Sequence, residues 1–294
     1  MNAKHHLPAG STAEGPYETV VTPESAGWGY SGLSVLNLEA GGSHTFDTGD
    51  AETLVLPLAG GCTVHCDGRT FDVQGRRGVF TRVTDFAYAP RDATVTVASE
   101  HGGRFALPSA KCERRLTARY GPAEDVPVEL RGAGQASRQV NNFCTPETFE
   151  ADKLIACEVL TPSSNWSSYP PHKHDEERDG EAELEEIYYF EVSGEGFGWQ
   201  RVYGTEARPI EVSKAVESGD VVLIPHGWHG PSAAAPGYHL YYLNVMAGPG
   251  SDRAWLICDD PAHGWIRATW DAQEIDPRLP LTSTRENEGD DDVR

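Results

Sequence analysis

The chain has 294 residues, a formal net charge of −21 at pH 7 and 38% hydrophobic residues. This hydrophobic fraction is enough for a globular core, so a disordered chain is excluded. The negative charge argues against a nucleic-acid partner, which would require clustered Lys and Arg. No run is apolar enough for a signal peptide or a membrane span, and we expect a cytoplasmic protein with no membrane partner.

Short strand-like runs recur along the chain, separated by Gly, Pro and Asp, and few segments have the 3.6-residue periodicity of a helix. The runs are 34–38, 53–58, 62–66, 78–81 and 93–98 in the first half, and 154–160, 186–192, 198–203, 220–224 and 240–245 in the second. This spacing predicts an all-β protein built from sandwiches or barrels.

Two of these runs resemble each other. Glu52 begins Glu-Thr-Leu-Val-Leu-Pro-Leu-Ala-Gly-Gly, and Glu186 begins Glu-Ile-Tyr-Tyr-Phe-Glu-Val-Ser-Gly. In each, an acidic residue opens a strand that ends in a Gly turn, and histidine lies upstream: His44 in the first, His172 and His174 in the second. The likeness favours an internal duplication, with two jelly-roll β-barrels in tandem (a bicupin).

The duplication suggests how the chain is divided. We expect an N-terminal cupin-like barrel at 18–119, a linker at 120–147, and a C-terminal barrel at 148–270. An acidic tail at 271–294 would follow. Its run of acids at 286–292 is expected to be solvated.

A metal-binding pattern lies in the second half. His172 and His174 are two residues apart, so in a strand both imidazoles point to one face. Glu186 opens the next strong strand, and His229 follows a Pro-x-Gly turn. Three imidazoles and a carboxylate suit Zn, Mn, Fe, Co or Ni and leave positions open for water or substrate. These four residues are the predicted ligands of a divalent metal.

The carboxylate ligand could be either of two neighbours. Glu186 shares its strand face with Tyr188 and Phe190, which we expect inside the barrel, and Glu185 points the other way. Glu186 is therefore the predicted ligand and Glu185 the alternative. The first half has neither a His-x-His pair nor a His after the matching strand, so we expect that barrel to be metal-free.

Several longer motifs resemble the 5-deoxy-glucuronate isomerases of inositol catabolism. They are Asn-Trp-Ser-Ser-Tyr-Pro-Pro-His-Lys-His-Asp at 165–175, Gln-Arg-Val-Tyr at 200–203, the run at 236–249, Thr-Pro-Glu-Ser-Ala-Gly-Trp at 22–28 and Asp-Pro-Ala-His-Gly-Trp at 260–265. The order of the four ligands is also the cupin pattern. The stretch from His174 to Glu186 is longer than usual for cupins, as is typical of the inositol-pathway members, and the Pro-x-Gly-x-His motif is one residue shorter.

The resemblance implies a bicupin fold and a metal-dependent aldose–ketose isomerase. Its substrate would be 5-deoxy-D-glucuronate and its product 5-dehydro-2-deoxy-D-gluconate. The related 4-deoxy-threo-hexosulose-uronate ketol-isomerases bind zinc through three His and one Glu, which fall here on His172, His174, Glu186 and His229. Zinc is therefore the metal that the resemblance favours.

The residues that would move the proton and hold the sugar acid remain open. Candidates for the base are Glu185, His226, Tyr188 and Tyr241, and the hydrogen could instead move as hydride. A guanidinium can grip a carboxylate through two hydrogen bonds, so Arg201 and Arg138 are the candidates for the anionic substrate. A cupin oxygenase or a non-catalytic sugar-binding cupin are the alternatives, and exposed strand edges would permit a homo-oligomer.

Overall fold

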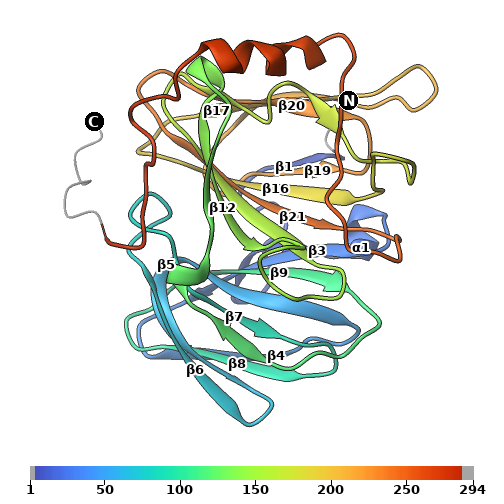
Figure 1. Cartoon of the computed structure of the whole chain (residues 1–294). Helices are drawn as coiled ribbons and strands as arrows, with labels where there is room; N and C mark the ends of the chain where they lie inside the picture. The colour runs from blue at the N-terminus through green and yellow to red at the C-terminus, as the bar shows by residue number, and fades with distance from the viewer. Residues whose placement is uncertain (1–3, 287–294) are drawn as a thin grey trace.

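Almost all regular structure in this protein is β-strand (Figure 1). The structure, a computed structural model, describes residues 4–286. Outside the strands there are only short helical segments in those residues: α1 (Pro23–Ala26), η1 (Ala123–Asp125), η2 (Gly134–Ala136) and η3 (Gly264–Ala272). None of them is long and apolar enough to span a membrane. The all-β prediction is confirmed.

The C-terminal half begins with a seven-stranded antiparallel sheet, here called the C inner sheet. In spatial order its strands are β1 (His6–Leu7), β19 (Val221–Ile224), β16 (Glu185–Val192), β21 (Leu240–Ala247), β13 (Ile155–Thr161), β12 (Arg138–Cys144) and β11 (Val128–Arg131). A second sheet forms the outer layer of this barrel. Its strands are β18 (Glu211–Val216), β17 (Gly198–Tyr203), β20 (Trp228–Ala234), β15 (His172–Lys173), β22 (Cys258–Asp259) and β14 (Trp166–Ser167).

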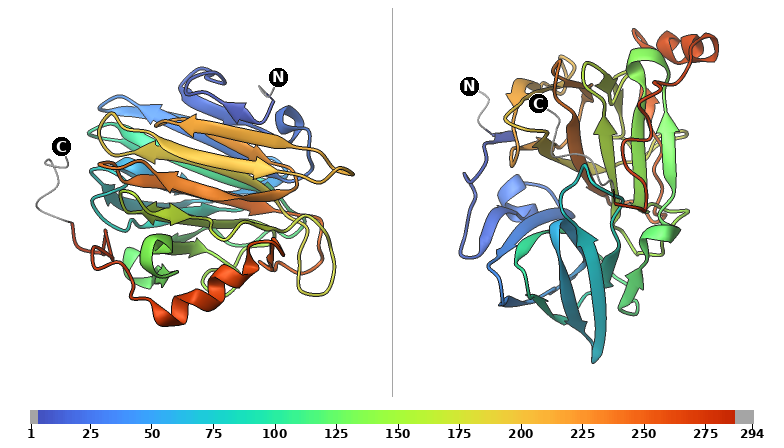
Figure 2. Two further views of the ribbon diagram at one scale, coloured as in Figure 1. Left: turned by 90° about the horizontal axis from the view of Figure 1, so that it is seen from above. Right: turned by 90° about the vertical axis from the view of Figure 1, so that its left-hand side faces the viewer.

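The N-terminal half repeats this plan. Its N inner sheet has the order β10 (Arg119–Gly121), β7 (Phe86–Ala89), β5 (Ala51–Cys66), β9 (Gly103–Lys111), β3 (Ser31–Leu38) and β2 (Tyr17–Val21). The long β5 continues into the outer layer, where it pairs with β6 (Arg69–Arg76) and β8 (Thr94–Ser99), and β8 pairs with β4 (Gly42–Asp47). The two halves form tandem cupin barrels, seen from two further sides in Figure 2.

One expected strand is absent. Residues 78–81 form a turn in which the Gly78 amide donates to the Thr81 hydroxyl and that hydroxyl donates to the Gly78 carbonyl. The apolar side chains of Val79 and Phe80 suggested a strand, but they pack from this turn against the core between the barrels. Burial alone therefore produced the apolar pattern.

The inner sheets are buried on both faces. On β16, Ile187 and Tyr189 pack against the other barrel, and Tyr188 and Phe190 point into their own. This explains why the strand is an almost continuous apolar run instead of an alternating one. Each large side chain buried in this way stabilises the fold by roughly 1.5–3 kcal/mol.

One strand, β1, crosses from the N-terminal end of the chain to the sheet of the other half. The N-terminal β1 pairs with β19 of the C inner sheet, and β10, from the linker region, pairs with β7 of the N inner sheet. The rest of the linker supplies β11 and β12 to the C inner sheet. Beyond η3 the chain returns to this linker, where buried Thr282 exchanges hydrogen bonds with Gln139. Most of the acidic run at 286–292 lies outside the described residues.

Two glutamates hold the barrels together in equivalent ways. The Glu185 carboxylate accepts hydrogen bonds from the amides of Gly29, Tyr30 and Ser31 in the N-terminal half. The Glu52 carboxylate accepts them from the amides of residues 152–154 in the C-terminal half. Glu52 is thus the counterpart of Glu185 and not of Glu186. The sequence comparison was wrong by one residue, which in a strand exchanges the two faces.

Candidate metal centre

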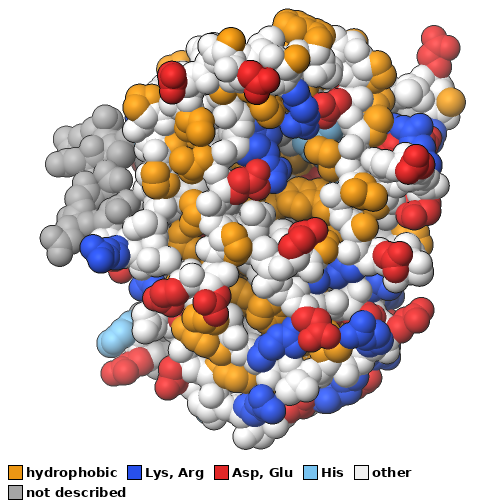
Figure 3. Space-filling view, in the orientation of Figure 1, with side chains coloured by type: hydrophobic (Ala, Val, Ile, Leu, Met, Phe, Trp, Pro, Cys, Tyr) orange, Lys and Arg blue, Asp and Glu red, His pale blue; other side chains and the backbone are white. Residues whose placement is uncertain are grey.

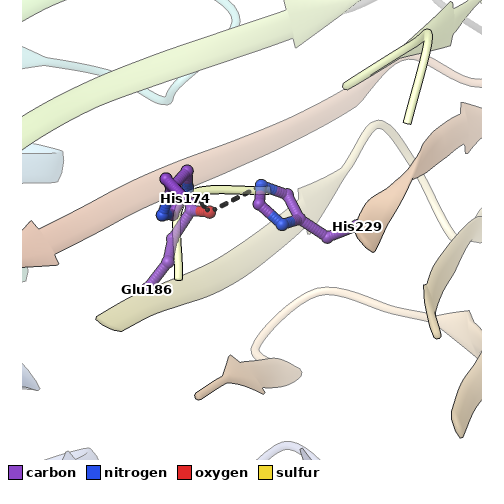
Figure 4. Close-up of side chains that lie close together, drawn as sticks. All are labelled: His174, Glu186 and His229. Atoms are coloured by element: carbon purple, nitrogen blue, oxygen red, sulfur yellow. Dashed lines mark hydrogen bonds and ion pairs between the residues drawn. The ribbon is translucent and has the colours of Figure 1, made fainter. Parts of the chain in front are cut away.

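Three ionisable side chains meet inside the C-terminal barrel. Ligand atoms of His174, Glu186 and His229 all lie within 4.8 Å of one another (Figure 4). Oε2 of Glu186 is 3.1 Å from Nε2 of His174 and 3.0 Å from Nε2 of His229. All three side chains are buried, so the charge of the carboxylate is poorly screened by water.

His172 lies beside this group. Its ring centroid is 4.4 Å from that of His229 and 6.4 Å from that of His174. His172 and His229 are directly opposed in the pairing of β15 with β20, which explains their proximity. The structure therefore gathers all four residues of the predicted ligand set in one place.

A glycine turn returns the chain from β19 to His229. Gly227 has φ +93°, and a Cβ there would lie 2.8 Å from the Tyr203 carbonyl oxygen and 2.9 Å from a methyl carbon of Ile210. Only glycine fits this turn without strain. Glu186 lies opposite Ile224, the last residue before the turn, so both ligands lie at one end of the barrel.

The histidines present the same nitrogen to the centre of the site. Nδ1 of His172 lies 3.2 Å from the Pro170 carbonyl oxygen, Nδ1 of His174 lies 3.2 Å from that of Leu184, and Nδ1 of His229 lies 3.4 Å from that of Gly227. A carbonyl oxygen only accepts, so each Nδ1 can donate to its carbonyl. Nε2 of His174 also donates to the Glu186 carboxylate here, and a metal ion would replace that proton, after which the three Nε2 atoms would present their lone pairs to the ion.

The electrostatics of the group suit a cation. Burial by itself would raise the pKa of Glu186, but His229 and His174 outweigh it and lower that pKa to about 2. Burial lowers the pKa of His172, which favours its neutral form. Nε2 of His229 has no hydrogen-bond partner in the described part of the chain, despite its proximity to Glu186. Burial would lower the pKa of His174, but its hydrogen bond with Glu186 outweighs burial and raises that pKa. A carboxylate together with imidazoles that release their protons when a metal binds is the donor set of a divalent metal ion.

Arg138 lines a small cavity together with two of the four predicted ligands, His172 and Glu186. The cavity walls include His172, Glu186, Tyr188 and Arg138, and in Figure 3 a hollow over the C-terminal half shows a His side chain near Lys and Arg side chains. Arg138 is 4% exposed and donates to two carbonyl oxygens, those of Ala136 and Tyr169. It forms no ion pair within residues 4–286, and burial lowers its pKa to about 10.

The other predicted site residues are spread over the barrel. Tyr188 lines the cavity, and its hydroxyl is 2.6 Å from the Ser168 hydroxyl. Tyr241 faces the other barrel, with the Arg76 guanidinium 5.7 Å from its ring centroid. Glu185 is held on the opposite face of β16 by the three amides described above.

His226 and Arg201 also lie apart from the cavity. His226 is half-buried in the turn after β19 and is absent from the cavity walls. Arg201 is exposed on β17 and stacks on Tyr203, 4.2 Å from its ring centroid. We propose no role in the reaction for either residue.

Three residues of the site were not predicted from the sequence. Asn244 donates a hydrogen bond to Oε1 of Glu186 and so fixes the carboxylate, and Arg131 and Trp255 complete the cavity wall. Arg131 is already paired with Glu129. Asn244 lies on the same strand face as Tyr242, so strand alternation would have placed it inside the barrel.

Tandem jelly-roll barrels with a buried His/Glu group in one of them define a bicupin with a site for a divalent metal. Solved structures agree on the fold: the chain superposes on an oxalate decarboxylase from Lactobacillus farciminis with a TM-score of 0.61 at 12% identity, covering 87% of this chain and 88% of that one. An IolB-like protein from Salmonella typhimurium LT2 gives a TM-score of 0.83 at 34% identity, covering 89% and 98%.

The chain belongs to the KduI/IolB family, whose model matches residues 5–266. It is 42% identical to a 5-deoxy-glucuronate isomerase from Geobacillus thermodenitrificans over 84% of this chain and 89% of the relative. It is 39% identical to one from Bacillus subtilis strain 168 over 84% and 91%. The resemblance seen in the sequence is confirmed, and the protein is an isomerase of this family.

Proposed function

We propose that this protein converts 5-deoxy-D-glucuronate to 5-dehydro-2-deoxy-D-gluconate, with a divalent metal, zinc by preference, held by His172, His174, Glu186 and His229. The observation that carries the proposal is that buried Arg138, which has no acidic partner within residues 4–286, lines the same cavity as Glu186 and His172. The cavity has a volume of only about 30 Å³, so the surrounding side chains must move before a sugar acid can place its carboxylate at Arg138 and its carbonyl at the metal.

The bound metal would supply Lewis acidity, polarising the sugar's carbonyl and stabilising the charge that develops as the hydrogen moves. The chain's own residues orient the substrate. The Arg138 guanidinium binds the substrate carboxylate, exchanging two weak carbonyl contacts for a charged pair. Asn244 keeps the Glu186 carboxylate in place while the substrate enters and leaves.

Of the four base candidates, only Tyr188 is among the described residues that line the cavity, but its chemistry there is that of a proton donor and not of a base. Burial raises its pKa, so the phenol is neutral and serves as a donor to the sugar oxygen. Ser168, 2.6 Å from the Tyr188 hydroxyl, would pass the proton on. Tyr188→Phe is therefore expected to lower kcat by about a hundredfold or more while the metal content is unchanged.

Turnover with the named substrate tests the proposal. Metal-replete protein is mixed with 5-deoxy-D-glucuronate, and NMR follows loss of the aldehyde and appearance of the ketose. Absence of turnover would contradict the proposal, and consumption of oxygen would indicate a cupin oxygenase instead. Metal analysis of protein purified without chelators identifies the ion. A metal other than zinc would correct the identity of the metal and leave the proposed reaction unchanged.

A further inference from the structure

The N-terminal barrel contains a cavity of its own. It has a volume of about 430 Å³ and opens between β2, the edge of the N inner sheet, and β4 of the outer layer. Ser34, Thr53 and Ser109 form its floor. This volume is in the range of small-molecule binding sites.

This cavity occupies the position that the metal centre has in the other barrel. Thr53 pairs with Ala89, the last residue of β7, as Glu186 pairs with Ile224, the last residue of β19. Both side chains are on the inward face of equivalent strands. The duplicated fold thus keeps a hollow in each barrel, with a hydroxyl in one where the other has a carboxylate ligand.

The floor presents three hydroxyls from adjacent strands. Thr53 on β5 is directly opposite Ser109 on β9, and Ser34 on β3 is opposite Leu107, which shares the strand face of Ser109. Within residues 4–286 none of the three hydroxyls has a hydrogen-bond partner, although Thr53 is only 4% exposed. Each can donate one hydrogen bond and accept two from a ligand in the cavity.

The charge around this cavity has the opposite sign to that of Arg138 in the C-terminal barrel. Glu14 and Asp47 are at the rim, and no Lys or Arg is among the described residues that line it. On a chain of net charge −21, such a rim repels an anionic sugar acid. The rings of Tyr17 and Phe46 form the wall, and Tyr17 is fixed by a 2.9 Å contact of its hydroxyl with Nε2 of His44.

We propose that the N-terminal barrel binds a neutral polyhydroxylated molecule of monosaccharide size. Its hydroxyls would pair with Ser34, Thr53 and Ser109, and its C–H face would pack on the aromatic wall. This site needs no metal and is independent of the proposed isomerisation in the C-terminal barrel.

Calorimetric titration of the full chain with D-glucose and D-sorbitol tests the proposal, with D-glucuronate as the matched acid. At least one neutral probe binds, and D-glucuronate binds to this site at least about tenfold more weakly than D-glucose. Binding of the neutral probe persists in His172→Ala, because that change affects only the other barrel. Failure of both neutral probes to bind overturns the proposal.

Variants locate the binding. Ser34→Leu fills the cavity and abolishes binding, and Thr53→Val removes one hydroxyl without changing shape and weakens it about fivefold. Thr45→Val, the same substitution at an exposed position of β4, leaves it unchanged. Binding that survives both Ser34→Leu and Thr53→Val, or that disappears in His172→Ala, overturns the proposal. Thermal unfolding checks that each variant is folded.

Discussion

The chemistry of the site depends on single atoms. Each of the four predicted ligands is fixed by a neighbour: backbone carbonyls fix the Nδ1 atoms of the three histidines, and Asn244 fixes Glu186. With their rotations restricted, Nε2 of His174 and Nε2 of His229 both point toward the Glu186 carboxylate. Such a preorganised group binds a divalent ion at little entropic cost.

Removing one imidazole should remove the metal. His172→Ala is expected to lower bound metal to near background and turnover by at least about a hundredfold, since a three-ligand site binds the ion more weakly. Elemental analysis and NMR turnover measure both on the same sample. His65→Ala, at an exposed position in the other barrel, is the control. Full activity of His172→Ala with normal metal content would contradict the ligand assignment.

Arg138 should separate binding from stability. Its charge is buried and has no acidic partner within residues 4–286, so Arg138→Met relieves a desolvation cost and should leave the thermal midpoint unchanged or higher. The same change should raise KM about tenfold or more through loss of the charged contact with the substrate. Exposed Arg201→Met should change neither value. A falling midpoint with normal KM would make Arg138 a structural residue.

At the scale of elements, the two faces of a strand have different functions. Along β16 one face carries the predicted metal ligand Glu186 and the aromatic side chains of the barrel interior, and the other carries Glu185 and the contact with the N-terminal barrel. The equivalent β5 does the same with Thr53 and Glu52. Neighbouring acids with the same intrinsic chemistry thus have unrelated roles because a strand alternates its side chains.

Glu185→Gln tests this division. One carboxylate oxygen that accepts amide hydrogen bonds is replaced by a donor, so the free energy of unfolding should fall by about 1–3 kcal/mol. Glu52→Gln, the matched variant in the other half, should behave alike. Urea denaturation measures the loss, and kcat of the folded Glu185→Gln protein should be nearly normal. A collapse of kcat with unchanged stability would instead make Glu185 the base.

The N-terminal strand β1 should respond to acid. Its residue His6 contacts Asp220 at 2.9 Å, and the Ala9 amide donates to the same carboxylate. Burial opposes the effect, but these hydrogen bonds lower the pKa of Asp220 below its ordinary value. A lowered pKa stabilises the fold above the ordinary Asp pKa of about 3.9, and this stability is lost as the pH falls below it.

Asp220→Asn should therefore flatten the stability profile in that acidic range. The variant is less stable than the unmodified chain at neutral pH, and the difference shrinks as the pH falls below about 4. Thermal unfolding over a pH series measures it, with the exposed Asp72→Asn as control. A difference that stays constant or grows in acid would show that the ionised carboxylate is not what anchors β1.

For the whole molecule, a buried ion pair joins the two barrels. Arg76 of the N-terminal half donates two hydrogen bonds to Glu158 of the C-terminal half, at 3.0 and 2.8 Å, and both side chains are fully buried. Asn141 also donates to this carboxylate. Two charges buried together are tolerable, whereas one alone is costly.

Breaking this pair should destabilise the whole chain. Arg76→Met leaves the Glu158 carboxylate buried between the barrels without its positive partner. This change is expected to lower the free energy of unfolding by about 3–5 kcal/mol. Adding Glu158→Gln removes this unpaired charge and should recover part of the lost free energy of unfolding. The double-mutant cycle, measured by urea denaturation, should therefore be non-additive. Additive losses would show that the two side chains contribute independently.

Much of this protein is determined locally. Every expected apolar run except 78–81 coincides with a strand, although 53–58 and 62–66 are parts of the single strand β5, and other strands, β9, β12 and β20 among them, were not predicted. Residue types at fixed spacing predicted His172, His174, Glu186 and His229 as ligands, since ligand chemistry and strand alternation are properties of neighbouring residues. The strand at 78–81 failed because burial from a turn leaves the same apolar pattern as a strand.

The tertiary structure decided what depends on distant segments. Whether Arg138 or Arg201 faces the cavity, and which of four base candidates reaches it, follows from the curvature and pairing of sheets whose strands are far apart in the chain. Three features arise only in the tertiary structure: the pairing of β1 with the C inner sheet, the one-residue correction that makes Glu52 the counterpart of Glu185, and the hydroxyl-lined cavity of the first barrel. Long-range pairing sets the register, and register decides which side chain faces inward.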